Sequence, residues 1–162
     1  MKATGEVLGI GKEFGTALNK AYAAAGVEIN NREKGIFVTL SDDEKPNFIK
    51  TINKYLELGF TLYTTKGTGE FLKTNDIDSV IVGKADDIGK TSLTIIEDKL
   101  VSLVINTPTY ANELSDGWKI RRLSHETGVA VVSSVREADA FIEAFLNQNL
   151  VLDDLEVIQD VS

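Results

Sequence analysis

The sequence has no cysteine and a single histidine among its 162 residues. Disulfides, thiol catalysis and cysteine-based zinc sites are therefore excluded. The histidine, His125, stands in "LSHETG" at the end of a predicted helix, where a solvated or capping role is favoured over a Ser-His-Asp arrangement. No apolar run approaches the length of a membrane span, and the N-terminus lacks the features of a signal peptide. We expect a soluble, cytoplasmic protein.

Positive charge is also scarce, because 17 Lys and Arg stand against 25 Asp and Glu, for a formal net charge of −8. Nucleic acid and anionic membranes would be repelled by such a surface, so we expect neither as a partner. A small anionic ligand would need a local cluster of lysine, threonine and backbone N–H groups. With 43% hydrophobic residues the chain can bury one substantial core, which predicts one domain with additions at its ends.

Short β-rich runs alternate with helical patterns over most of the chain. Strands are predicted in the segments 35–40, 60–65, 78–83, 100–107 and 128–134. The helix that begins in "SDDEKP" is the clearest, because Phe48, Ile52 and Tyr55 follow helical spacing until Gly59 stops it. Further helices are predicted at 69–76, 90–100, 116–128 and 135–148. The alternation predicts an α/β fold whose parallel sheet is covered on both faces.

The first thirty residues break this alternation. The segment "EFGTALNKAYAAAG" predicts an alanine-rich helix that ends at Gly26, and the polar link "EINNREKG" follows it. This segment is either an appendage to the α/β domain or the trailing edge of a preceding one.

Ligands of open parallel sheets bind beyond the carboxyl ends of the strands, so the residues there are the candidate site. These positions hold Thr39, Ser41, Lys45, Thr64, Thr65, Lys66, Gly67, Thr68, Gly83, Lys84, Asn106, Thr107, Thr109, Ser133 and Ser134. Lysines, hydroxyls and free N–H groups in one place favour a phosphate or carboxylate pocket. Two alternatives stay open: a merely polar rim, and for "YTTKGTGEFL" a tight turn with a threonine N-cap. Neither the P-loop pattern nor the dinucleotide-binding glycines follow the first strand.

Other conspicuous residues have simpler interpretations. Arg121 and Arg122 diverge on a helix, so at most one would reach a given pocket. Trp118 is expected in the core or between helices. The acidic residues of "SDDE" are expected to complement a helix dipole, and "KADDIGK" is expected to be a solvated loop.

Several ordered motifs resemble one known family. The segment "ATGEVLGIGKEFGTALNKAYAAAG" is similar to the end of the second synthetase half of the carbamoyl-phosphate synthase large subunit. The segments "LGFTLYTTKGTGEFL", "VGKADD", "LVINT", "KIRRLS" and "LEVIQDV" resemble the C-terminal regulatory domain of that subunit, a member of the methylglyoxal-synthase-like superfamily. The resemblance implies three α/β/α layers around a five-stranded parallel sheet of order 3-2-1-4-5. Residues 1–30 would then belong to the preceding synthetase domain and its linker, and 31–162 to the regulatory domain.

The resemblance also implies a pocket for the phosphate of a nucleotide effector such as UMP or IMP. Its residues would be Lys45, Thr65, Lys66, Gly67, Thr68, Lys84 and Asn106. No catalytic residue, metal or cofactor is expected in this domain, whereas the parent ligase would use ATP and Mg. The synthetase half of the same subunit and the glutaminase small subunit are the implied protein partners, and a homo-oligomer stays open. Pro108 stands where a relative has a ligand-contacting Thr.

Two alternatives to an effector domain follow from the same family. A methylglyoxal-synthase-type phosphate lyase needs a His and an Asp where Leu114 and Gly117 fall, so the chain lacks that general acid and base. A ligand-free oligomerisation module is the other alternative. Val131 and Ser133 occupy the positions that contact ornithine in ornithine-activated relatives, so ornithine activation is not expected.

Overall fold

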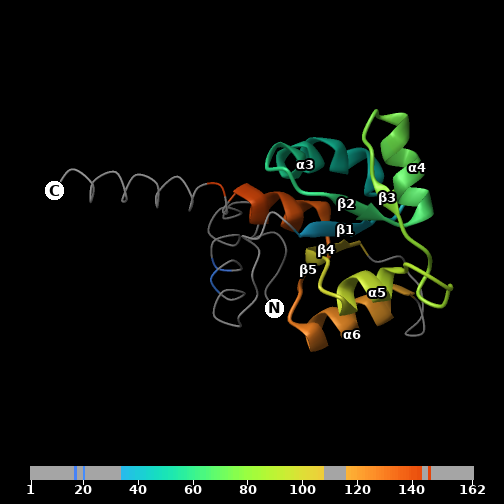
Figure 1. Cartoon of the computed structure of the whole chain (residues 1–162). Helices are drawn as coiled ribbons and strands as arrows, with labels where there is room; N and C mark the ends of the chain where they lie inside the picture. The colour runs from blue at the N-terminus through green and yellow to red at the C-terminus, as the bar shows by residue number, and fades with distance from the viewer. Residues whose placement is uncertain (1–16, 18–19, 21–33, 108–115, 144–145, 147–162) are drawn as a thin grey trace.

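The computed structural model describes residues 17, 20, 34–107, 116–143 and 146 (Figure 1). The expected alanine-rich helix before Gly26, the domain boundary after residue 30, and the positions Pro108, Thr109 and Leu114 lie outside the described residues.

The described part of the chain contains five strands in one sheet. They are β1 (Gly35–Thr39), β2 (Leu62–Thr64), β3 (Val80–Ile81), β4 (Val101–Asn106) and β5 (Ala130–Val132). Their order is β3-β2-β1-β4-β5, and every neighbouring pair is parallel. The predicted fold class and strand order are confirmed. The order reverses between β1 and β4, which creates a topological switch point at the carboxyl ends of these two strands.

Helices cover both faces of the sheet, as Figure 1 shows. They are α3 (Lys45–Glu57), α4 (Lys66–Thr74), α5 (Ser92–Glu97), α6 (Asp116–Thr127) and a helical segment at 135–143. One apolar cluster joins α3, α4 and the 135–143 segment to the sheet, and a second joins α5 and α6 to its other face. Successive β1 residues contribute to the two clusters in turn, Ile36 and Val38 to one and Phe37 to the other, because strand side chains alternate between faces.

Helix α3 is anchored by the apolar stripe that the sequence predicts. Phe48, Ile52 and Tyr55 are buried, and Gly59 adopts a φ of +88° just beyond the helix, a conformation that favours glycine. The Tyr55 hydroxyl donates a 2.7 Å hydrogen bond to the carbonyl of Ala138, which ties α3 to the 135–143 segment.

Three sequence-based expectations need correction, and a fourth is confirmed. Helix α4 begins at Lys66, three residues before the predicted start, so "YTTKGTGEFL" is a strand end and a helix rather than a loop. The first turn of α3 contains no acidic residue, because "SDDE" precedes the helix. Trp118 is 36% exposed and not a core residue, with the Arg122 guanidinium 5.3 Å from its ring centroid. The loop "KADDIGK" is solvated as expected, because all of its residues except Ala85 are exposed, and two of them, Lys84 and Asp87, also line a cavity.

None of the helices in the described part of the chain combines the length and apolar character that crossing a bilayer requires.

Candidate functional site

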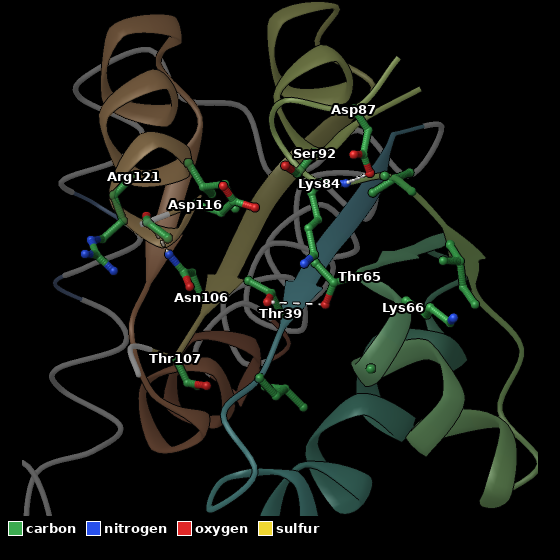
Figure 2. Close-up of a pocket in the computed structure, with 17 residues that line it drawn as sticks. Thr39, Thr65, Lys66, Lys84, Asp87, Ser92, Asn106, Thr107, Asp116 and Arg121 are labelled. Atoms are coloured by element: carbon green, nitrogen blue, oxygen red, sulfur yellow. Dashed lines mark hydrogen bonds between the residues drawn. The ribbon is translucent and has the colours of Figure 1, made fainter. Parts of the chain in front are cut away.

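A cavity of about 600 Å³ lies over the carboxyl ends of β1, β2 and β4, at the switch point of the sheet (Figure 2). Its lining residues are Thr39, Leu40, Thr65, Lys66, Gly67, Ile81, Val82, Gly83, Lys84, Asp87, Ser92, Asn106, Thr107, Asp116, Gly117, Ile120 and Arg121. Five of the seven residues implied by the family resemblance line it, namely Thr65, Lys66, Gly67, Lys84 and Asn106. The other two, Lys45 and Thr68, lie beside it.

Threonine hydroxyls gather where β1 and β2 end. Thr65 is the N-cap residue of α4, but its side chain does not cap the helix. Its hydroxyl lies instead within 3.4 Å of the Thr39 hydroxyl and 3.3 Å of the Thr68 hydroxyl. Thr68 is buried beneath and accepts a 3.1 Å hydrogen bond from the N–H of Leu40. A threonine therefore occupies the N-cap position as expected, but it makes no capping hydrogen bond, so the N–H groups at the start of α4 keep no side-chain acceptor from Thr65.

Lys84 provides a positive charge at the centre of the cavity. Figure 2 shows its side chain pointing toward Thr39 and Thr65, and it makes no ion pair with any side chain of the described residues. The backbone N–H of Lys84 donates a 2.8 Å hydrogen bond to a carboxylate oxygen of Asp87. A Cβ at Gly83 would lie 3.0 Å from the Asp87 side chain, so the tight start of this loop favours glycine. The loop thus fixes the origin of the lysine side chain and leaves its ammonium group for a ligand.

Two further lysines approach from the helices on one side. Lys66 lines the cavity at the first position of α4. Lys45 forms a 2.7 Å ion pair with exposed Asp42, and the hydrogen bond and charge of Lys45 lower the pKa of that carboxyl. The Lys45 ammonium nitrogen would lie 3.8 Å from a Cβ built on Gly67. Lys45 therefore reaches the rim beside Gly67 without lining the cavity.

The β4 end is held by side-chain hydrogen bonds. Asn106 is 3% exposed and its amide donates a 3.0 Å hydrogen bond to the carbonyl of Gly117 at the start of α6. The Thr107 hydroxyl accepts a 2.6 Å hydrogen bond from the N–H of Ser41, after β1. These hydrogen bonds join the end of β4 to α6 and to the segment after β1, on both sides of the switch point. By contrast, Ser133 and Ser134, after β5, do not line the cavity but bond to Glu137.

The sequence interpretation missed two carboxylates and one serine. Asp87 comes from the loop after β3, and Asp116 accepts a 3.5 Å hydrogen bond from the N–H of Ala85 in the same loop. Ser92 begins α5. Only tertiary structure brings these residues to the cavity, and no spacing in the sequence indicated it.

Arg121 lines the cavity, whereas Arg122 bonds to Glu126 at 3.1 Å, so the expectation that only one arginine would reach it is confirmed. The lining residues include three cations (Lys66, Lys84 and Arg121) and two carboxylates, although the whole chain carries −8. His125 lies exposed in the last turn of α6 and does not line the cavity. Within the described residues, no group of three potential ligands could hold a metal ion.

A parallel sheet of order 3-2-1-4-5 with a polar cavity at its switch point defines a doubly wound α/β domain with a ligand-type crevice. A family model described as "MGS-like domain" matches residues 47–133, and the chain belongs to this family.

The chain is also similar to proteins named carbamoyl phosphate synthase large chain. It is 37% identical to that of Lachnoclostridium phytofermentans over 91% of its own length, which is 14% of the relative. It is 37% identical to the "C-terminal section" of the large chain of Aquifex aeolicus over 89% of its length, and 34% identical to that of Methanocaldococcus jannaschii. The chain spans only 14–27% of the length of these relatives. The family resemblance drawn from the motifs is confirmed.

Proposed function

We propose that this chain is the allosteric regulatory domain of a carbamoyl phosphate synthase large chain, and that its cavity binds the phosphate of a nucleotide effector such as UMP or IMP. The similarity to large chains and to their C-terminal sections supports the first part. The observation that carries the second is that Lys84 after β3, Thr39 at the end of β1 and Thr65 at the start of α4 come together in the cavity, in a protein of strongly acidic composition.

This group has the chemistry that a phosphate monoester requires. Lys84 would supply the main charge, and the hydroxyls of Thr39 and Thr65 would donate to phosphate oxygens once they leave one another. The N–H groups of Lys66 and Gly67, at the positive end of the α4 dipole, would complete the set. Lys66 itself and Lys45 would add charge at the rim.

Binding would regulate the parent enzyme only if the effector has different affinities for two states of the whole large chain. The parent activity would be ATP-dependent carbamoyl phosphate synthesis with ATP and Mg bound elsewhere. Its synthetase half and the glutaminase small subunit would be the partners of this domain.

A second function has one observation in its favour, since two carboxylates line the cavity. A phosphate lyase acting on a triose phosphate needs a base and an acid near the reacting carbon. Asp87 and Asp116 could supply one of these groups, but the only histidine of the chain does not line the cavity. We expect no turnover of dihydroxyacetone phosphate. Turnover that Asp87→Asn or Asp116→Asn abolishes would establish the lyase instead.

Calorimetric titration with UMP, IMP, phosphoribosyl pyrophosphate and ornithine tests the proposal. Saturable binding of a phosphorylated compound is expected, with affinity lowered at least about tenfold by Lys84→Ala because a charge-assisted contact is lost. Lys90→Ala is the matched control, because Lys90 follows the same strand but packs over the ring of Tyr63 at 5.6 Å instead of lining the cavity. Ornithine is expected not to bind.

Binding that Lys84→Ala and Lys90→Ala affect equally would refute the phosphate site. If no compound binds and the chain dimerises even with Lys45→Ala and Lys84→Ala, the ligand-free oligomerisation module would be the better interpretation.

A further inference from the structure

Two buried hydroxyls within the described residues have no hydrogen-bond partner, those of Ser92 and Ser102. Ser92 is 1% exposed and lines the candidate site, whereas Ser102 is 3% exposed and lies near the opposite end of the sheet. A buried hydroxyl without a partner is unfavourable, so each requires an explanation.

The Ser92 hydroxyl is not needed to cap α5 or to bond to the backbone. The start of α5 is already capped, because the Thr91 hydroxyl accepts from the N–H of Thr94 at 3.2 Å and the Thr94 hydroxyl accepts from the N–H of Thr91 at 2.8 Å. The N–H of Ser92 bonds to the carbonyl of Gly83 at 3.1 Å, which leaves only the side chain unused. Serine hydroxyls in helices often bond to a nearby carbonyl, and this one does not.

Apolar and acidic side chains share the wall of the cavity near Ser92, where Asp87 lies against Gly83. Val82 and Ile120, at 4% and 2% exposure, line the same cavity, and Ile81 lies beside Val82. Figure 2 shows Ser92 at the end of the cavity away from Thr39 and Thr65. The cavity thus has a cationic, hydroxyl-rich end near Thr39 and Thr65, and another end near Ser92 that combines apolar side chains, the Asp87 carboxylate and one unused hydroxyl. Apolar walls with few polar groups are typical of sites that bind a flat ring and recognise its edge.

We propose that Ser92 is a specificity-determining residue that hydrogen-bonds the nucleobase of the ligand. The inference rests on the proposed function, which places the phosphate at the other end of the cavity. The base lies against Val82 and Ile120, and the Ser92 hydroxyl, which donates and accepts, bonds to a group on the edge of the ring. Ligand binding then provides the partner that the free protein lacks.

Ser102 has a different explanation and provides the control. Along β4 it is the extra residue of a register shift, because Gly35 pairs with Val101 and Ile36 with Leu103. Lys34 and Lys99 line the small cavity there, at the end of the sheet where α5 and α6 finish. Lysines at helix C-termini complement the dipole, so this second cavity does not by itself indicate a ligand.

The test measures UMP and ribose 5-phosphate binding to the 162-residue chain, unmodified and with Ser92→Ala or Ser102→Ala. Ser92→Ala is expected to lower UMP affinity by about tenfold, the value of one hydrogen bond in a dry site, and ribose 5-phosphate affinity by less than about twofold. Ser102→Ala is expected to leave both affinities unchanged. Neither substitution should lower the midpoint of thermal unfolding, because each removes an unpaired hydroxyl.

Failure of the proposal for Ser92 can be distinguished from failure of the proposed function. If Ser92→Ala leaves UMP affinity unchanged, or weakens both ligands equally, while Lys84→Ala still abolishes UMP binding, the role of Ser92 is refuted and the phosphate site stands. If the unmodified chain binds ribose 5-phosphate as tightly as UMP, the role of Ser92 is likewise refuted and the phosphate site stands. If neither compound binds, the proposed function and this inference fall together.

Discussion

Two glycines in the first turns of α4, Gly67 and Gly69, should respond in opposite ways to the same substitution. Neither has a positive φ, so alanine fits the backbone at both positions. In a helix, alanine is more stable than glycine by about 1 kcal/mol, with less gain near the terminus. A Cβ at Gly67 meets nothing closer than the Lys45 ammonium at 3.8 Å. Gly67→Ala is therefore expected to stabilise the fold by about 0.5–1 kcal/mol.

At Gly69 the new Cβ would lie 2.6 Å from the Thr64 hydroxyl and 2.7 Å from Ile81 Cγ1. Thr64 is fully buried, and its hydroxyl shares a 2.9 Å hydrogen bond with that of Ser79, so it cannot move freely. Overpacking of this kind costs about 1–3 kcal/mol, which cancels or exceeds the gain in helix propensity. Gly69→Ala should therefore be less stable than Gly67→Ala by about 1–3 kcal/mol.

Urea unfolding followed by circular dichroism measures both variants, with equal slopes required for a valid comparison. In the same preparation Gly67→Ala should bind UMP about tenfold more weakly, because the added methyl group would lie where the proposed site brings the phosphate to the start of α4. Equal stabilities of the two variants would refute the close packing of α4 on β2 and β3. Unchanged UMP affinity of Gly67→Ala would refute the role of the α4 N-terminus.

The remaining predictions concern caps and pH. Thr65→Ala should lower the free energy of unfolding by less than about 0.5 kcal/mol, because the Thr65 side chain makes no cap hydrogen bond. Thr91→Ala breaks a capping box and should lower it by about 1 kcal/mol. Equal losses of the two variants in urea unfolding would contradict this assignment. Burial, and then the charge of Asp139, raise the pKa of Tyr55 well above its ordinary value of 10.0, so the unfolded state loses its phenol proton first and stability should fall as pH rises above 10.0. Unfolding at several alkaline pH values should show a shallower fall in stability for Tyr55→Phe than for the unmodified chain. Burial lowers the pKa of Lys54, but its hydrogen bonds and charge interactions with Asp139 and Glu143 raise it, and the net pKa lies above 10.5. The contribution of these ion pairs to the free energy of unfolding is therefore complete below pH 10.5 and is lost as the pH rises through the pKa of the folded state. Lys54→Met should therefore also flatten the alkaline fall, and an unchanged pH profile would contradict the ion-pair contribution.

The parts of the fold that repeat a simple period were predictable. Strand and helix alternation indicated the parallel sheet, and the stripe of Phe48, Ile52 and Tyr55 located α3. The start of α4 was missed because the threonines and Gly67 of "TTKGT" indicated a loop or tight turn, so the helix was predicted to begin only at Gly69. The glycine at position 69 is explained by tertiary packing, because the sheet lies too close to α4 there to leave room for a Cβ. Local propensity carries no information about such packing.

The residues of the candidate site were also predictable only in part. Residues at strand ends, such as Lys84 and Asn106, could be expected from topology alone, because parallel strands deliver their carboxyl ends to one edge. Asp87, Asp116 and Ser92 depend on how a loop and two helices fold back over that edge. Nothing in the spacing of these residues encodes that path.

The proposed anion site lies in a chain of charge −8, which has a consequence for the salt dependence of ligand binding. The attraction of Lys84, Lys66 and Arg121 acts over a few ångströms, whereas the repulsion by the remaining carboxylates acts over the whole domain. At an ionic strength of about 0.15 M the Debye length is about 8 Å, so most of the repulsion is screened while the local attraction persists. At about 0.01 M the length grows to about 30 Å, and the repulsion reaches the ligand. UMP affinity should therefore be highest at intermediate salt, and a steady rise in affinity down to 0.01 M would show that the local cations dominate at all distances.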